Sequence, residues 1–169
     1  FLTSGEEASM QLETGRFRYL FVLQAFTKIY AVPGIRLGYG ISSDKALLER
    51  METVRQPWSV STPAQAAGLS ALKEDHREEQ TRQLVKSERE RMEKELENLR
   101  IEYIPSEANF LLFNSEINWF EELKKRGILI RDCANYRGLG NGWYRLAVRL
   151  PEENDRLLEC MKQVLNERS

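Results

Sequence analysis

The sequence has little of the chemistry that builds metal centres or disulfide frameworks. Its 169 residues include one histidine, His76, and two cysteines, Cys133 and Cys160. This scarcity excludes most sites made of clustered histidine and cysteine ligands, and it excludes a fold held by several disulfides. We therefore expect no metal site and a reducing, cytoplasmic setting. We interpret both cysteines as small apolar fillers and His76, which stands between charged residues, as a surface side chain.

The sequence also lacks an excess of charge of one sign, and it lacks a long apolar run. The 25 Lys+Arg and 26 Asp+Glu leave a formal net charge of −1, so no general field attracts nucleic-acid phosphates or anionic membranes. No apolar run approaches the ~20 residues that span a bilayer, and the first residues lack the order of a signal peptide. The 41% hydrophobic and 30% charged content is typical of a globular chain with a core. We expect neither a nucleic-acid nor a membrane partner.

The first third has the pattern of an α/β protein. The almost continuous apolar run over residues 17–26 predicts a strand covered on both faces, as in a parallel or mixed sheet. A second strand is predicted over 37–41, and Pro33-Gly34 marks a turn between the two. The apolar spacing over 44–54 predicts an amphipathic helix.

The middle of the chain is predicted to be helical. Thr62 is expected to cap a helix, with Pro63 at its first position and Gln65 reaching back. Residues 73–100 hold 17 charged residues in 28, and the 8 basic and 9 acidic ones are interleaved. This pattern predicts a long helix with a salt-bridged outer face and no basic stripe for nucleic acid. Its buried stripe is predicted to be Val85, Met92, Leu96 and Leu99.

The last third alternates short strands and helices. Strands are predicted over 102–104, 108–113, 128–131 and 143–149, and helices over 117–126 and 151–166, with a glycine-rich loop over 136–142. The chain as a whole therefore predicts an α/β class with three parts: an α/β piece, a connecting helix and a small α/β subdomain.

A lysine directly follows the first predicted strand. Lys28 has no acidic residue within seven positions on either side. Low-dielectric surroundings at a buried strand end would lower the pKa of its ammonium group and make the amine a nucleophile suited to Schiff-base chemistry. The residues alone leave open a plainer interpretation, in which Lys28 and Arg36 simply face solvent.

Residues 25–40, AFTKIYAVPGIRLGYG, resemble the lysine segment of class I/II aminotransferase-type pyridoxal 5′-phosphate (PLP) enzymes of fold type I. In that family a Ser/Thr-Lys pair is followed eight residues later by arginine in a Gly-x-Arg-x-Gly context. The resemblance implies that Lys28 holds the cofactor and moves protons, that Arg36 pairs with the cofactor phosphate, and that Thr27 adds a hydroxyl. Ala25 departs from the many relatives with Ser or Thr there, so one phosphate contact is lost or supplied elsewhere.

The resemblance extends over essentially the whole chain and aligns it with the C-terminal half of a full enzyme. Residues 55–68, 109–113 and 128–139 are similar to segments of the threonine-phosphate decarboxylase and histidinol-phosphate aminotransferase group. The implied fold is the C-terminal portion of a PLP-dependent transferase. Residues 1–57 would be the incomplete end of the large-domain sheet, 58–100 the connecting helices and 101–169 the small α/β subdomain.

Two arginines also match the family pattern. Arg145 matches the arginine that binds the substrate α-carboxylate, and Arg131 matches the one that receives the substrate phosphate. The alternative for each is a strand-end arginine paired with a surface carboxylate. Arg137 and Arg149 are weaker candidates, and we leave them outside the predicted site.

The resemblance implies one of three functions. The first is a PLP-dependent L-threonine-O-3-phosphate decarboxylase of cobalamin synthesis, in which the Cα–carboxylate bond breaks. The second is a histidinol-phosphate aminotransferase or a related class I/II aminotransferase, in which Lys28 removes the Cα proton. The third is a non-catalytic, dimerising fragment, because the family's remaining cofactor contacts would lie before Phe1. We expect a small phosphorylated amino acid as substrate, a homodimer at full length, and no activity of the isolated chain.

Overall fold

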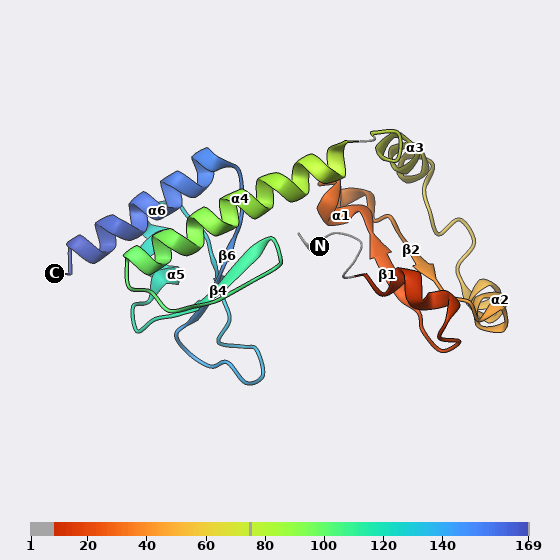
Figure 1. Ribbon diagram of the computed structural model, residues 1–169, viewed down its shortest axis with the longest axis horizontal. Helices are drawn as coiled ribbons and strands as arrows, with labels where there is room; N and C mark the ends of the chain where they lie inside the picture. The colour runs from red at the N-terminus through yellow and green to blue at the C-terminus, as the bar shows by residue number, and fades with distance from the viewer. Residues whose placement is uncertain (1–8, 75, 169) are drawn as a thin grey trace. The chain divides into compact units, whose positions relative to one another are not determined.

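The computed structural model describes residues 9–74 and 76–168. The chain divides into two compact units, and the boundary falls between Thr81 and Arg82. Both units combine short antiparallel sheets with helices, which confirms the predicted α/β class (Figure 1). Within the described residues, none of the helices is both long and apolar enough to span a bilayer.

Unit 1 is built on a two-stranded antiparallel ribbon. Strand β1 (Val22–Ala25) pairs with β2 (Gly38–Ile41), and a short 3-10 helix, η2 (Met10–Gly15), precedes them. The predicted strand over 17–26 is therefore wrong in length and in sheet type. Its first residues form a turn in which the Leu20 N–H donates to the Phe17 carbonyl at 3.0 Å.

The helices of unit 1 largely follow the sequence signals. Helix α1 (Phe26–Ile29) and the 3-10 helix η3 (Pro33–Ile35) connect the two strands. Helix α2 (Lys45–Val54) is capped by Asp44, as predicted for 44–54. Helix α3 (Thr62–Ala71) is capped one residue earlier than predicted.

The cap of α3 is Ser61, not Thr62. The Ser61 Oγ accepts from the Ala64 N–H at 3.3 Å, which places Thr62 and Pro63 inside the first turn. The Gln65 side chain donates to the Val60 carbonyl, which lies before the helix, and it does not accept from the backbone N–H of the cap residue as predicted. Proline is tolerated at either of the first two helical positions, because a backbone N–H there has no partner within the helix. The proline alone therefore left the predicted start of the helix uncertain by one residue.

Unit 2 contains a four-stranded antiparallel sheet in the order β3-β4-β6-β5. Its strands are β3 (Tyr103–Ile104), β4 (Phe110–Asn114), β5 (Arg131–Asp132) and β6 (Trp143–Ala147). Its helices are α4 (Arg77–Asn98), which crosses the unit boundary, α5 (Trp119–Lys125) and α6 (Pro151–Asn166). Helices α4 and α6 run alongside each other in Figure 1 and are joined by side-chain contacts.

One face of this sheet is buried and the other is open. Leu111 and Phe113 of β4 and Tyr144 and Leu146 of β6 are each at most 5% exposed, whereas the alternate residues on both strands are half-buried or exposed. The buried face shares the core with Met92, Leu96, Trp119, Leu123, Met161 and Val164 from the three helices. The open face therefore carries the odd-numbered residues of β6.

Strand β5 begins later than predicted. The expected strand over 128–131 is reduced to Arg131 and Asp132, because the preceding residues complete the end of α5. Gly127 has φ +75° and the Ile128 N–H donates to the Leu123 carbonyl at 2.9 Å. A glycine in this left-handed conformation is a common way to end a helix.

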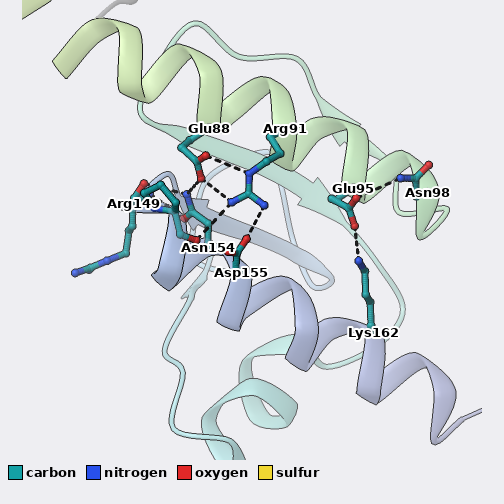
Figure 2. A network of polar contacts seen from close by, with 9 residues as sticks. Glu88, Arg91, Glu95, Asn98, Arg149, Asn154, Asp155 and Lys162 are labelled. Atoms are coloured by element: carbon teal, nitrogen blue, oxygen red, sulfur yellow. Dashed lines mark hydrogen bonds and ion pairs between the residues drawn. The ribbon is translucent and has the colours of Figure 1, made fainter. Parts of the chain in front are cut away.

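A buried polar network joins α4 to the turn between β6 and α6 (Figure 2). Asn154, 1% exposed, accepts from the Arg149 N–H at 3.0 Å and donates to the Arg149 carbonyl at 2.9 Å. Its amide also donates to Glu88 Oε2 at 2.7 Å. Arg91 binds the same Glu88 oxygen at 2.7 Å and Asp155 Oδ1 at 2.6 Å. The Arg149 guanidinium points away from the network in Figure 2, so the network holds this residue through its backbone.

The predicted apolar stripe is confirmed at three of its four positions, because α4 ends at Asn98 and Leu99 lies beyond it. Val85, Met92 and Leu96 are buried and Leu99 is half-buried, whereas Glu88 and Arg89 of the same helix are buried as well. The charged surface was expected to face solvent. Buried charges are stable only when they are paired and hydrogen-bonded, and the network supplies those partners for Glu88.

The network predicts a pH dependence of unit 2. Hydrogen bonds from Arg91 hold the pKa of the Glu88 carboxyl below its usual value of 4.5. A carboxyl whose pKa is lower in the folded state stabilises the fold above its unfolded pKa, and this contribution is lost as the pH falls through the folded pKa. We expect the free energy of unfolding to fall as the pH drops through 4.5 and on through the lower folded pKa of Glu88, and Glu88→Gln to remove part of that slope.

Urea unfolding at several pH values measures this slope. Glu90→Gln is the matched control, because Glu90 lies on the same helix and is exposed. Equal slopes in the wild-type chain and in Glu88→Gln would contradict the role of this carboxylate.

Candidate functional site

The residues predicted to hold a cofactor lie on one loop of unit 1. Thr27 and Lys28 are in α1, directly after β1, and Arg36 is two residues before β2. Ala25 is paired with Gly38 across the ribbon, so the two ends of this loop meet. The structure therefore brings the predicted lysine and arginine to the same end of the ribbon, as their spacing required.

Lys28 lies on the exposed side of α1. The buried side is taken by Phe26, 6% exposed, whose ring stacks on Tyr30 at 5.0 Å and meets Tyr39 edge-on at 6.0 Å. In the described part of the chain, the Lys28 side chain makes neither a hydrogen bond nor an ion pair. The expectation of low-dielectric surroundings is wrong for this chain, because one helical turn directs Phe26 inward and Lys28 outward. The amine is open to a ligand.

Arg36 has an unusual backbone. Its φ of 57° and ψ of 42° are left-handed, and Ala31 on the same loop has φ 54°. Such conformations cost a non-glycine residue of the order of 1 kcal/mol, and they gather at binding sites. Its Nη1 donates to the Pro33 carbonyl at 3.1 Å, which leaves further N–H groups of the guanidinium for an anion.

The two arginines predicted to bind substrate are neighbours in unit 2. Arg131 of β5 pairs directly with Arg145 of β6, and both lie on the open face of the sheet. Like charges directly opposite each other destabilise a sheet. Among residues 9–74 and 76–168, no carboxylate forms an ion pair with either guanidinium. Two adjacent guanidinium groups of this kind can bind an anion.

Neutral side chains hold each guanidinium. The Cζ of Arg145 lies 5.0 Å from the ring centroid of Phe110, on the neighbouring strand. Arg131 donates from Nη2 to Asn135 Oδ1 at 3.1 Å, and its Cζ lies 5.5 Å from the Tyr136 ring. Sequence reasoning missed these three partners. Two of them, Asn135 and Tyr136, follow Arg131 by four and five residues and lie outside the predicted strands and helices, and this short spacing was the available signal.

Arg149 has a different environment. Its Nη2 lies 2.7 Å from Glu153 Oε1, one helical turn into α6. This is the kind of surface ion pair that was the alternative for Arg131 and Arg145, and it supports leaving Arg149 outside the site.

Two cavities of unit 2 are lined by residues near the arginine pair but not by the two arginines themselves. The larger, about 510 Å³, is lined by polar residues that include Ser115, Asn118 and Asp132. The side-chain oxygens of these three accept from nearby backbone N–H groups, so they serve the local turns. The smaller, about 290 Å³, lies beside residues 127–130 and α6. Neither contains a predicted site residue.

Comparisons with known proteins agree with the predicted family. Residues 4–160 match the family described as aminotransferase class I and II. The chain is 39% identical to the threonine-phosphate decarboxylase of Salmonella typhimurium over 87% of its own length and 42% of the relative. It is 38% identical to the histidinol-phosphate aminotransferase of Symbiobacterium thermophilum, covering 86% of this chain and 40% of that one.

A solved structure has the same fold. The histidinol-phosphate aminotransferase of Clostridium acetobutylicum matches with a TM-score of 0.93 and 31% identity, covering 98% of this chain and 52% of that one. The chain thus spans less than half the length of the two curated relatives and about half of this structure. By sequence and by fold, the chain belongs to the class I and II aminotransferase family.

Proposed function

We propose that this chain forms the C-terminal portion of a PLP-dependent enzyme that decarboxylates L-threonine O-3-phosphate. The observation that carries the proposal is the Arg131–Arg145 pair on the open face of the sheet of unit 2. Two adjacent guanidinium groups without a carboxylate partner in the described residues suit a substrate with two anionic groups. L-Threonine O-3-phosphate has a carboxylate and a phosphate, whereas histidinol phosphate has only the phosphate.

The loop of unit 1 fits the cofactor. Lys28 offers an exposed amine for the aldehyde of PLP, Arg36 an anion-binding guanidinium for its phosphate, and Thr27 a half-buried hydroxyl. When bound, PLP would supply an electron sink for the bond that breaks at Cα. No serine or threonine stands at Ala25, so Arg36 and Thr27 would carry the phosphate contacts of this loop.

The roles of the chain's residues follow from their chemistry. Arg145 would bind the substrate carboxylate through two parallel hydrogen bonds, with its plane held against Phe110. Arg131 would bind the substrate phosphate. Lys28 would hold the cofactor and return a proton to Cα after carbon dioxide has left.

Transamination of histidinol phosphate is the second candidate. The similarity to the Clostridium acetobutylicum enzyme over nearly the whole chain favours it. In this reaction Lys28 would remove the Cα proton, and Arg145 would bind the carboxylate of the amino-group acceptor. The two reactions differ in which bond at Cα is oriented for cleavage.

A paired assay separates the two. The full-length protein that carries this chain, supplied with PLP, is given L-threonine O-3-phosphate in one reaction and histidinol phosphate with 2-oxoglutarate in the other. Carbon dioxide release without amino-group transfer is expected. Amino-group transfer without carbon dioxide release would make the aminotransferase the better assignment.

Replacing Arg145 by lysine is expected to raise the KM for L-threonine O-3-phosphate by roughly 10- to 100-fold. Lysine keeps the charge but loses the planar fork and the contact with Phe110. Steady-state kinetics measure the effect. Arg149→Lys is the matched control, because its guanidinium is paired with Glu153, and its KM is expected to stay at the wild-type value. An unchanged KM in Arg145→Lys would remove Arg145 from the site.

A further inference from the structure

Asn135 engages one edge of the Arg131 guanidinium. The group donates from Nη2 to Asn135 Oδ1 at 3.1 Å, and the Tyr136 ring lies 5.5 Å from its Cζ. A guanidinium has five N–H donors in one plane. The hydrogen bond to Asn135 and the contact with the Tyr136 ring restrain that plane and leave donors on another edge for an oxyanion.

The turn that carries these two residues is itself fixed. Asp132 Oδ1 accepts from the Ala134 N–H at 2.8 Å, and the Tyr136 N–H donates to the Cys133 carbonyl at 3.0 Å. The Cys133 N–H donates to the Trp143 carbonyl of β6 at 2.9 Å, and its side chain is completely buried. Asn135 and Tyr136 are therefore held by the sheet.

Both partners orient the guanidinium without neutralising it. An amide oxygen and an aromatic ring carry no net charge, whereas the nearby Arg149 is paired with the carboxylate of Glu153 at 2.7 Å. Arg131 therefore keeps its full charge for a ligand, next to the second unneutralised guanidinium of Arg145.

We propose that Asn135 and Tyr136 are positioning residues that aim Arg131 at the phosphate of the substrate and so set the preference for phosphorylated substrates. This inference rests on the proposed function, because it assigns the phosphate to Arg131. The assignment requires a neutral residue at position 135. An aspartate there would keep the shape of the side chain and the hydrogen bond, but its negative charge would offset the positive charge of Arg131.

Steady-state kinetics of the full-length holoenzyme test the assignment. Asn135→Ala is expected to raise the KM for L-threonine O-3-phosphate about five- to tenfold, with kcat within about twofold. Asn135→Asp is expected to raise it further, although it is nearly isosteric. Tyr136→Leu should resemble Asn135→Ala, and Tyr136→Phe should resemble the wild type because it keeps the ring. Competitive inhibition by inorganic phosphate should weaken in parallel.

Asn141→Ala is the matched control, since Asn141 is an exposed asparagine on the glycine-rich loop over 136–142, which directly follows Asn135. A wild-type KM and a wild-type phosphate inhibition constant in Asn135→Asp would overturn the inference, as would a fall in kcat alone. If the wild-type holoenzyme turns over neither phosphorylated substrate, the proposed function fails. Calorimetry with inorganic phosphate then decides the positioning role: weaker binding by Asn135→Asp than by the wild type supports it, and equal binding overturns it.

Discussion

Replacing Lys28 by alanine is expected to lower turnover by roughly 10⁴-fold or more and to remove covalent attachment of the cofactor. The structure places this amine on the exposed side of α1, without an ion pair or hydrogen bond in the described part of the chain. In the proposed reaction it both binds the cofactor and moves the proton at Cα. Loss of the amine removes both functions at once.

Borohydride reduction with PLP present, followed by peptide mass mapping, gives a readout that does not depend on turnover. The label is expected on the peptide that contains Lys28, and it should be absent in Lys28→Ala. Lys45→Ala is the control, because Lys45 is another exposed lysine of unit 1. A label on any other lysine of the wild-type protein would overturn the assignment.

Asn154→Ala is expected to lower the free energy of unfolding of unit 2 by about 3 kcal/mol. The amide makes three hydrogen bonds in a buried position, two to the Arg149 backbone and one to Glu88. Removing it leaves a backbone N–H, a carbonyl and part of a carboxylate without these partners. Unsatisfied buried groups of this kind are among the few single changes that destabilise strongly.

Urea denaturation measures this loss. Asn98→Ala provides the comparison, since Asn98 makes one exposed contact with Glu95 at 3.5 Å and its loss is expected to cost about 0.5 kcal/mol or less. Similar midpoints for the two variants would show that the buried network does not support the fold.

Helices were predictable where the apolar spacing was clear. Helix α2 begins at Lys45, one residue after the predicted start, and α6 begins at Pro151 as predicted. The apolar run over 17–26 was misleading because hydrophobicity alone does not distinguish a buried strand from exposed apolar residues. Phe17 and Tyr19 are 53% and 89% exposed in this chain. Short apolar segments carry little information on their partners.

The polar interior was not predictable from local pattern. Glu88 lies in a helix of interleaved charges, which is typical of a solvated surface, and its partner Asn154 is 66 residues away. Nothing in the sequence near Glu88 indicates that the two meet.

The arginine pair was predicted only as two separate residues. Resemblance to the family selected Arg131 and Arg145, but their direct pairing depends on the register of β5 against β6. A slip of one residue in that register would place the two guanidinium groups on opposite faces. Register is a tertiary property, set here by the buried residues of β6 such as Tyr144 and Leu146.

The strand order has a consequence for biosynthesis. Strand β6 lies between β4 and β5 and is the last of the four to leave the ribosome. Until it emerges, β5 has no neighbour in the sheet and β4 is paired on one side only. The sheet of unit 2 therefore stays incomplete while β3, β4, α5 and β5 are synthesised. A pause in translation just before Trp143 would expose the edge of β4, and with it the opportunity for pairing with another nascent chain.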